Sequence, residues 1–102
     1  MAKSEVASKV EVRNINAPGY VTKVDKVKYD DMKKAMLKAL PKRGPGLTQQ
    51  EIRDAVLPHL SKEVFSGGEK VGWWAKCVQL DLEARGTIIR NAKAKPLRWT
   101  RD

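Results

Sequence analysis

Cysteine and histidine are nearly absent from this chain of 102 residues, which has one of each, Cys77 and His59. A single cysteine excludes an internal disulfide, and one cysteine plus one histidine cannot form a zinc site. The sequence contains no Gly-x-Ser-x-Gly motif, and a lone histidine offers no recognisable catalytic triad. We therefore expect a non-enzyme that holds neither a metal nor a cofactor.

Long apolar runs are also missing. No run approaches the roughly 18 residues that a membrane helix requires, and the segment from Met1 to Val10 lacks the apolar core of a secretory signal. The hydrophobic fraction of 41% is ordinary for one soluble domain. These absences predict a cytoplasmic protein that does not enter a membrane.

Positive charge is abundant and unevenly distributed. The formal net charge is +9, with +4 on residues 25–46, +5 on residues 70–102 and −2 on residues 47–69. From Arg85 to Arg101 there are six basic side chains and no acidic one. Charge concentrated on part of a folded surface attracts polyanions, because their binding releases counterions. A basic surface that only maintains solubility is the alternative.

Residues 1–23 are expected to form an N-terminal arm, disordered at its start and holding one short strand. Val10-Glu11-Val12-Arg13 alternates apolar and polar residues, as a half-exposed strand does. Pro18-Gly19 then predicts a turn into the first helix. An unpaired strand exposes backbone donors and acceptors, which predicts pairing with another element or with a second chain in a homodimer. An extended arm without a partner is the alternative.

Residues 24–102 are expected to form the folded domain, beginning with two helices. The first should run from Asp25 to Leu40, with Asp25 as its N-cap and an apolar stripe through Tyr29, Met32 and Met36. The second should follow Thr48-Gln49-Gln50-Glu51, a capping box in which Thr48 and Glu51 satisfy each other's backbone N–H groups. Pro58 should end that helix at Leu57. We assign Glu51 to capping rather than to acid–base chemistry.

The third helix should span Val71 to Arg85 and end at Gly86. Trp74, Ala75, Val78 and Leu82 share one face, which we assign to the core, whereas Trp73 and Lys76 point elsewhere. Two strands, Thr87–Arg90 and Pro96–Thr100, should then form a hairpin with Leu97 and Trp99 facing inward. Three helices followed by a basic hairpin predict a mainly α winged helix-turn-helix, with the hairpin as its wing.

Several motifs carry a resemblance to known families. They are Pro45-Gly46-Leu47-Thr48, Pro58-His59-Leu60, Gly72-Trp73-Trp74-Ala75-Lys76 and Pro96-Leu97-Arg98-Trp99. With these motifs the chain, from about Asn14 onward, resembles a small bacterial family of domains of unknown function. Residues 70–101 are more loosely similar to winged-helix domains of transcription regulators and to the N-terminal domain of Mrr-type restriction proteins. That second resemblance implies DNA binding.

Two classes of function remain. In the first, the protein binds duplex DNA with its third helix in the major groove and its wing on the backbone. The residues expected at this interface are Lys70, Trp73, Lys76, Arg90, Lys93, Lys95 and Arg98. In the second, the domain is a protein-interaction or dimerisation module whose contact patch is formed by Trp73 and Leu80. Exposure of Trp73 together with Leu80 would favour the second class.

Overall fold

The computed structural model describes residues 9–65 and 70–102, so the disordered start expected for the chain lies outside the described residues. Helix α1 (Lys26–Ala39) begins where its N-cap predicts: the Asp25 carboxylate accepts the Val27 backbone N–H at 2.9 Å. Its stripe of Tyr29, Met32 and Met36 is buried, also as predicted.

Helix α2 (Gln49–Val56) starts at the predicted capping box. The Thr48 hydroxyl accepts the Glu51 N–H at 3.2 Å, and the Glu51 carboxylate accepts the Thr48 N–H at 2.9 Å. The bond from the Thr48 backbone lowers the pKa of Glu51, with the Arg98 cation adding to the effect. The short 3-10 helix η2 (Leu57–His59) continues from α2, so the α-helix ends as Pro58 predicts.

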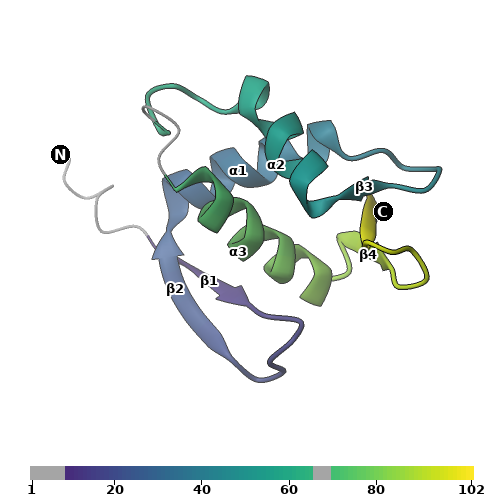
Figure 1. Cartoon of the computed structure of the whole chain (residues 1–102). Coiled ribbons are helices and arrows are strands. Elements are labelled where there is room, and N and C mark those ends of the chain that lie inside the picture. The colour runs from purple at the N-terminus through teal and green to yellow at the C-terminus, as the bar shows by residue number, and fades with distance from the viewer. Residues whose placement is uncertain (1–8, 66–69) are drawn as a thin grey trace, which may run out of the picture.

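Helix α3 (Val71–Ala84) lies at the centre of the molecule, with α1 and α2 on one side and two N-terminal strands on the other (Figure 1). The predicted core face is correct, because Trp74, Ala75, Val78 and Leu82 are all buried. Burial extends further round the helix, to Gln79 and Asp81. A helix buried on several sides packs against more than one neighbour, which is why α3 contacts every layer of the fold.

The N-terminal strand pairs within its own chain. Strand β1 (Lys9–Arg13) runs antiparallel to β2 (Val21–Asp25), with Val10 opposite Val24 and Val12 opposite Thr22. The segment that we expected to lead straight into the first helix is therefore the second strand of a hairpin. The ground for a homodimer, an unpaired β1, no longer holds.

A second sheet closes the end of the molecule where α3 ends. Its order is β3 (Leu47–Thr48), β5 (Arg98–Arg101), β4 (Ile88–Asn91), all antiparallel. The predicted hairpin corresponds to β4 and β5, and Trp99 is buried as expected. Leu97 was wrongly expected to face inward, since it precedes β5 and is exposed.

The prediction of a mainly α winged helix-turn-helix is wrong. The chain forms a mixed α/β domain of three α-helices with a two-stranded and a three-stranded antiparallel sheet. The β1–β2 hairpin packs on α3, and β3 adds a third strand to the expected wing. In the described parts of the chain, no helix is both long and apolar enough to span a membrane.

Candidate functional site

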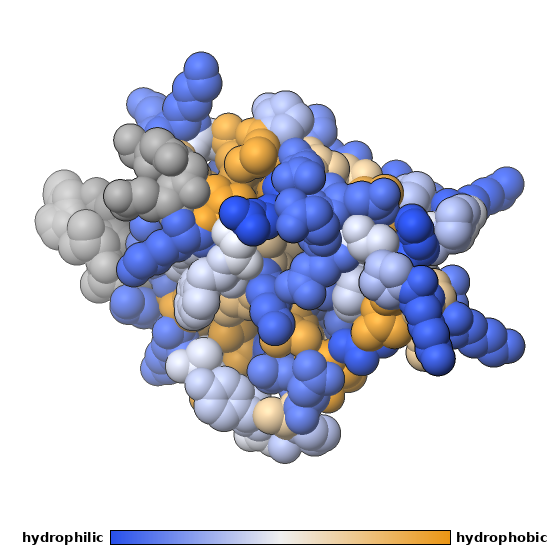
Figure 2. All heavy atoms as spheres, in the orientation of Figure 1, coloured by the Kyte–Doolittle hydropathy of each residue, from blue (hydrophilic) through white to orange (hydrophobic). Residues whose placement is uncertain are grey.

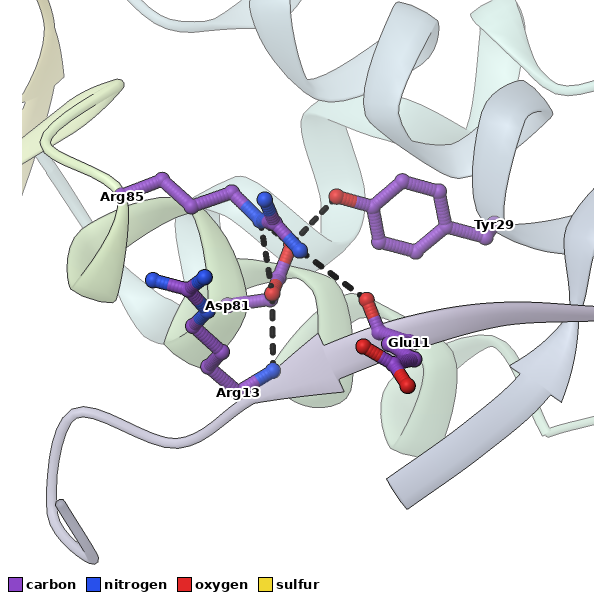
Figure 3. A network of polar contacts seen from close by, with 5 residues as sticks. All are labelled: Glu11, Arg13, Tyr29, Asp81 and Arg85. Carbon is purple, nitrogen blue, oxygen red and sulfur yellow. Dashed lines mark hydrogen bonds and ion pairs between the residues drawn. The ribbon is translucent and has the colours of Figure 1, made fainter. Parts of the chain in front are cut away.

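One buried carboxylate fixes the β1–β2 hairpin to α3 (Figure 3). Asp81 accepts the Arg13 backbone N–H at 2.8 Å, the Tyr29 hydroxyl and, at 2.9 Å, the Arg85 guanidinium. Arg85 in turn donates to the Glu11 carbonyl at 3.0 Å. A buried charge is tolerated when it is paired and fully hydrogen-bonded, and Asp81 meets both conditions. The network therefore sets the position of the hairpin relative to α3.

This arrangement raises the pKa values of Tyr29 and Arg85. Burial raises the pKa of the Tyr29 hydroxyl well above its usual range, and the hydrogen bond to Asp81 adds to that rise. The bond to Asp81 likewise raises the pKa of Arg85. Tyr29 therefore stays neutral and Arg85 stays charged, which leaves Asp81 and Arg85 as an ion pair with a phenol as the third partner.

A groove opens between α3 and the hairpin, and we call it the hairpin groove. It has a volume of about 240 Å³. Its lining from α3 is Trp73, Lys76, Cys77 and Leu80, and its lining from the hairpin is Val12, Arg13, Asn14, Tyr20 and Thr22. The α3 residues are spaced three and four apart, so they form one stripe of the helix. Figure 2 shows one face of the molecule, where hydrophobic side chains are exposed in a few patches among mostly hydrophilic ones.

The hairpin groove brings together two of the predicted interface residues and lies apart from the loop between β4 and β5, residues 92–97, which we call the wing tip. Trp73 and Lys76 both line it, and Lys70 lies one turn before Trp73 at the N-cap of α3. Trp73 is 57% exposed. A helix of α3's length spans about 21 Å, and β4 follows its far end (Figure 1). The α3 residues and the wing tip are therefore at opposite ends of one helix.

Two of the predicted wing residues have partners within the chain. Arg90 donates to both carboxylate oxygens of Glu83, at 2.9 and 3.2 Å, and its guanidinium lies 5.8 Å from the centre of the Trp99 ring. Arg98 donates to the Gly46 carbonyl at 2.9 Å and to Glu51 at 3.2 Å. These bonds attach β4 to α3 and β5 to α2. Lys93 and Lys95 lie in the loop between β4 and β5 and are exposed.

A second basic surface gathers residues that the sequence prediction had not combined. A shallow hollow is lined by four basic residues, Lys33, Lys34 and Lys38 of α1 and Arg101 of β5, together with Asp30 and Leu37. The Arg101 backbone N–H donates to the Pro41 carbonyl at 3.0 Å. The two exposed residues that follow Pro41, Lys42 and Arg43, therefore begin beside Arg101. We call this surface the basic strip; its members are Lys33, Lys34, Lys38, Lys42, Arg43 and Arg101.

The sequence did not predict the part of the groove that the hairpin contributes: Val12, Arg13, Asn14, Tyr20 and Thr22. The signal was present, since Val10–Arg13 and Val21–Val24 alternate in the same way on either side of Pro18-Gly19. Two alternating segments around a turn favour a hairpin. For the basic strip there was no local signal, because it joins α1 to a strand 61 residues later.

The fold and its surfaces define the class: a small basic mixed α/β domain with an aromatic-lined groove and exposed lysines. The chain belongs to a family of unknown function (DUF6958), whose family model matches residues 9–99. This confirms the resemblance to a family of unknown function, whereas similarity to winged-helix proteins is not shown. No curated protein and no solved structure matches the chain.

Proposed function

We propose that this protein is a non-enzymatic nucleic-acid-binding domain that holds its ligand, duplex DNA included, through phosphate contacts. The proposal is based on one observation: many acidic side chains are hydrogen-bonded within the chain, whereas many lysines are exposed. Within the described residues, seven acidic side chains accept hydrogen bonds from the chain itself: Asp25, Asp30, Asp31, Glu51, Asp54, Asp81 and Glu83.

The lysines differ from the acidic side chains in how many of them have a partner within the chain. Among residues 9–65 and 70–102, Lys26 is the lysine that forms an ion pair, with Asp30. Lys34, Lys38 and Lys42 of the basic strip, and Lys93 and Lys95 of the wing tip, are exposed. Flexible exposed ammonium groups bind phosphates as point charges without a fixed geometry. Acidic side chains that bond within the chain, together with lysines that remain exposed, support binding to a polyanion without preference for one nucleotide sequence.

The β1–β2 hairpin restricts how α3 can contact DNA. A major groove about 12 Å wide admits one helix or one two-stranded ribbon, and α3 carries the hairpin beside its exposed stripe. Insertion of α3 alone is therefore disfavoured, and we propose that the basic strip and the wing tip make the phosphate contacts. Lys70 and Lys76 would add contacts near the hairpin groove.

The test measures binding to a short duplex across a range of salt concentrations. If about five phosphates are neutralised, the slope of log K against log salt should be roughly −4 to −5. Lys34→Glu with Lys38→Glu should weaken binding and flatten the slope by about 2, as should Lys93→Glu with Lys95→Glu. The matched control, Lys9→Glu with Lys62→Glu, makes the same charge change at exposed positions off both surfaces. No binding by the folded protein at about 50 mM salt would reject the proposal.

A protein-interaction module is the second candidate. Trp73 is exposed, Leu80 is half-buried, and both line the hairpin groove. An aromatic anchor in such a groove can contribute about 2 kcal/mol or more at an interface. This function predicts that Trp73→Ala abolishes partner binding, whereas the charge reversals on the basic strip leave it intact.

A further inference from the structure

The hairpin groove places two exposed aromatic rings on neighbouring walls. Trp73 comes from α3 and is 57% exposed, and Tyr20 comes from the β1–β2 turn and is 54% exposed. Trp73 is also oriented, because its ring packs edge-to-face on buried Trp74, with 5.1 Å between centroids and an interplanar angle of 84°. Trp74 itself packs against Phe65, with 6.3 Å between the ring centroids. A ring held in this way offers a stacking face with little loss of side-chain freedom on binding.

Charge around these rings has one sign. Arg13 and Lys76 line the groove, and none of the described lining residues is acidic. Exposed Lys70 lies one turn before Trp73. Stacking rings interleaved with cations are the arrangement by which proteins bind single-stranded nucleic acids, with the base on the ring and the phosphate on the cation.

The size and the polar edge of the groove narrow the ligand further. A volume of about 240 Å³ is smaller than the roughly 300–1,000 Å³ of pockets for drug-sized ligands. It therefore suits one planar group rather than a long peptide. Asn14 accepts the Asn16 N–H through Oδ1 at 2.8 Å, which leaves its Nδ2 amide as a donor, and the Thr22 hydroxyl lies on the same wall. Both groups can bond to the edge of a base.

We infer that the hairpin groove binds an unpaired nucleobase of single-stranded DNA or RNA, stacked on Trp73 with its phosphate near Arg13 and Lys76. This inference rests on the proposed function and deepens it, because it adds a site that a closed duplex cannot fill. Bases within a duplex are stacked on their neighbours and present only their edges. Single strands should therefore bind more tightly than a duplex of the same length.

The experiment titrates the full chain with a 12-residue oligo-dT, a 12-residue oligo-U and a 12-base-pair duplex, following binding and tryptophan fluorescence. We expect both single strands to bind more tightly and to quench the fluorescence. Trp73→Ala should weaken single-strand binding about tenfold, with duplex binding unchanged within about twofold. Trp73→Phe should restore most of the affinity, because it keeps a stacking ring. Ile89→Ala, at another exposed apolar position, is the matched control.

The outcomes separate the two proposals. If duplex and single strands bind equally and Trp73→Ala changes neither, the groove inference is overturned while the phosphate-binding function stands. If no nucleic acid binds to the folded protein, both fall. Quenching by a short acidic peptide with one aromatic residue, and not by either oligonucleotide, would assign the groove to a protein partner and also overturn the inference.

Discussion

Asp81 of α3 accepts a hydrogen bond from the Arg13 backbone N–H, 68 residues earlier in the chain, at 2.8 Å. The same carboxylate holds the Tyr29 hydroxyl of α1, so it joins three elements at one point (Figure 3). Arg13 and Tyr20 line the hairpin groove from the same hairpin. The shape of the groove therefore depends on Asp81, a buried residue that does not line it.

We predict that Asp81→Ala destabilises the protein and loosens the hairpin. The substitution leaves the buried Tyr29 hydroxyl without an acceptor, which costs about 1–3 kcal/mol of unfolding free energy. Urea denaturation measures this loss, and hydrogen exchange at the Arg13 amide should become faster. Tyr29→Phe is the control: it removes the hydroxyl but leaves the bond from Arg13 to Asp81, so exchange at Arg13 should be unchanged. Equal protection of Arg13 in Asp81→Ala would refute the role assigned to this bond.

The two adjacent tryptophans should respond differently to truncation. Trp74 is 6% exposed, so Trp74→Ala should cost roughly 3–5 kcal/mol, as for other large-to-small core substitutions. Trp73→Ala should cost only about 0.5–1.5 kcal/mol, the value of its edge-to-face contact with Trp74. Thermal or urea denaturation of both variants checks the order. The reverse order would mean that the rotation of α3 is different from that described.

Two glycines with the same backbone conformation provide a matched pair. Gly46 and Gly44 have φ values of +85° and +87°, so alanine at either position should cost about 1–2 kcal/mol from the left-handed backbone. A Cβ on Gly46 would also clash with the Trp99 backbone carbonyl oxygen, whereas one on Gly44 meets nothing within 4 Å. Gly46→Ala should therefore lower the melting temperature more than Gly44→Ala. Equal effects would show that β3 and β5 are not this close.

Stability should fall at alkaline pH because of Cys77. Burial, with Asp81 adding to it, raises the pKa of this thiol from 9.0 to about 11. Between these values the unfolded chain releases the thiol proton while the folded chain keeps it, so rising pH favours unfolding. The stabilisation is complete below about pH 9 and is lost as pH passes 11. The raised pKa of Tyr29 also lowers the free energy of unfolding, at higher pH. The contribution of Cys77 is therefore measured as the difference in the pH dependence of unfolding free energy between the protein and Cys77→Ala.

The raised pKa also bears on the reactivity of the Cys77 thiol. A cysteine next to Lys76 could have a lowered pKa and act as a redox sensor. The raised pKa instead favours a structural residue that lines the hairpin groove. Reaction with iodoacetamide at pH 8 should accordingly be slower than that of a free thiol.

The helices were predictable because their signals are local. Asp25 and the Thr48–Glu51 box lie next to the backbone groups that they cap, and the apolar spacing of α3 identified Trp74 as a core residue and placed Trp73 off the core face. The β4–β5 hairpin followed from alternation after Gly86. Each of these features depends on residues within about one or two turns of one another, which is the range that periodicity reports.

The sheets and the site were not predictable to the same extent. β3 has two residues, too few to show a period. Arg90 and Arg98 were assigned to a ligand because nothing in the sequence showed that Glu83 and Glu51 would approach them. The buried role of Asp81 depends on Arg13 and Tyr29, which are distant in sequence. Among the predicted interface residues, the structure brings together Trp73 and Lys76, which share one stripe of α3.

The central position of α3 has a consequence for synthesis of the chain. Residues 9–25, which form the first hairpin, leave the ribosome well before residues 71–84 have been made. Until then Val12 has no α3 to pack against and the Arg13 N–H has no Asp81. Contacts this distant in sequence require a long loop to close first, which slows folding. The nascent hairpin therefore emerges without the helix that it later covers, and the domain can be completed only when its last third is released.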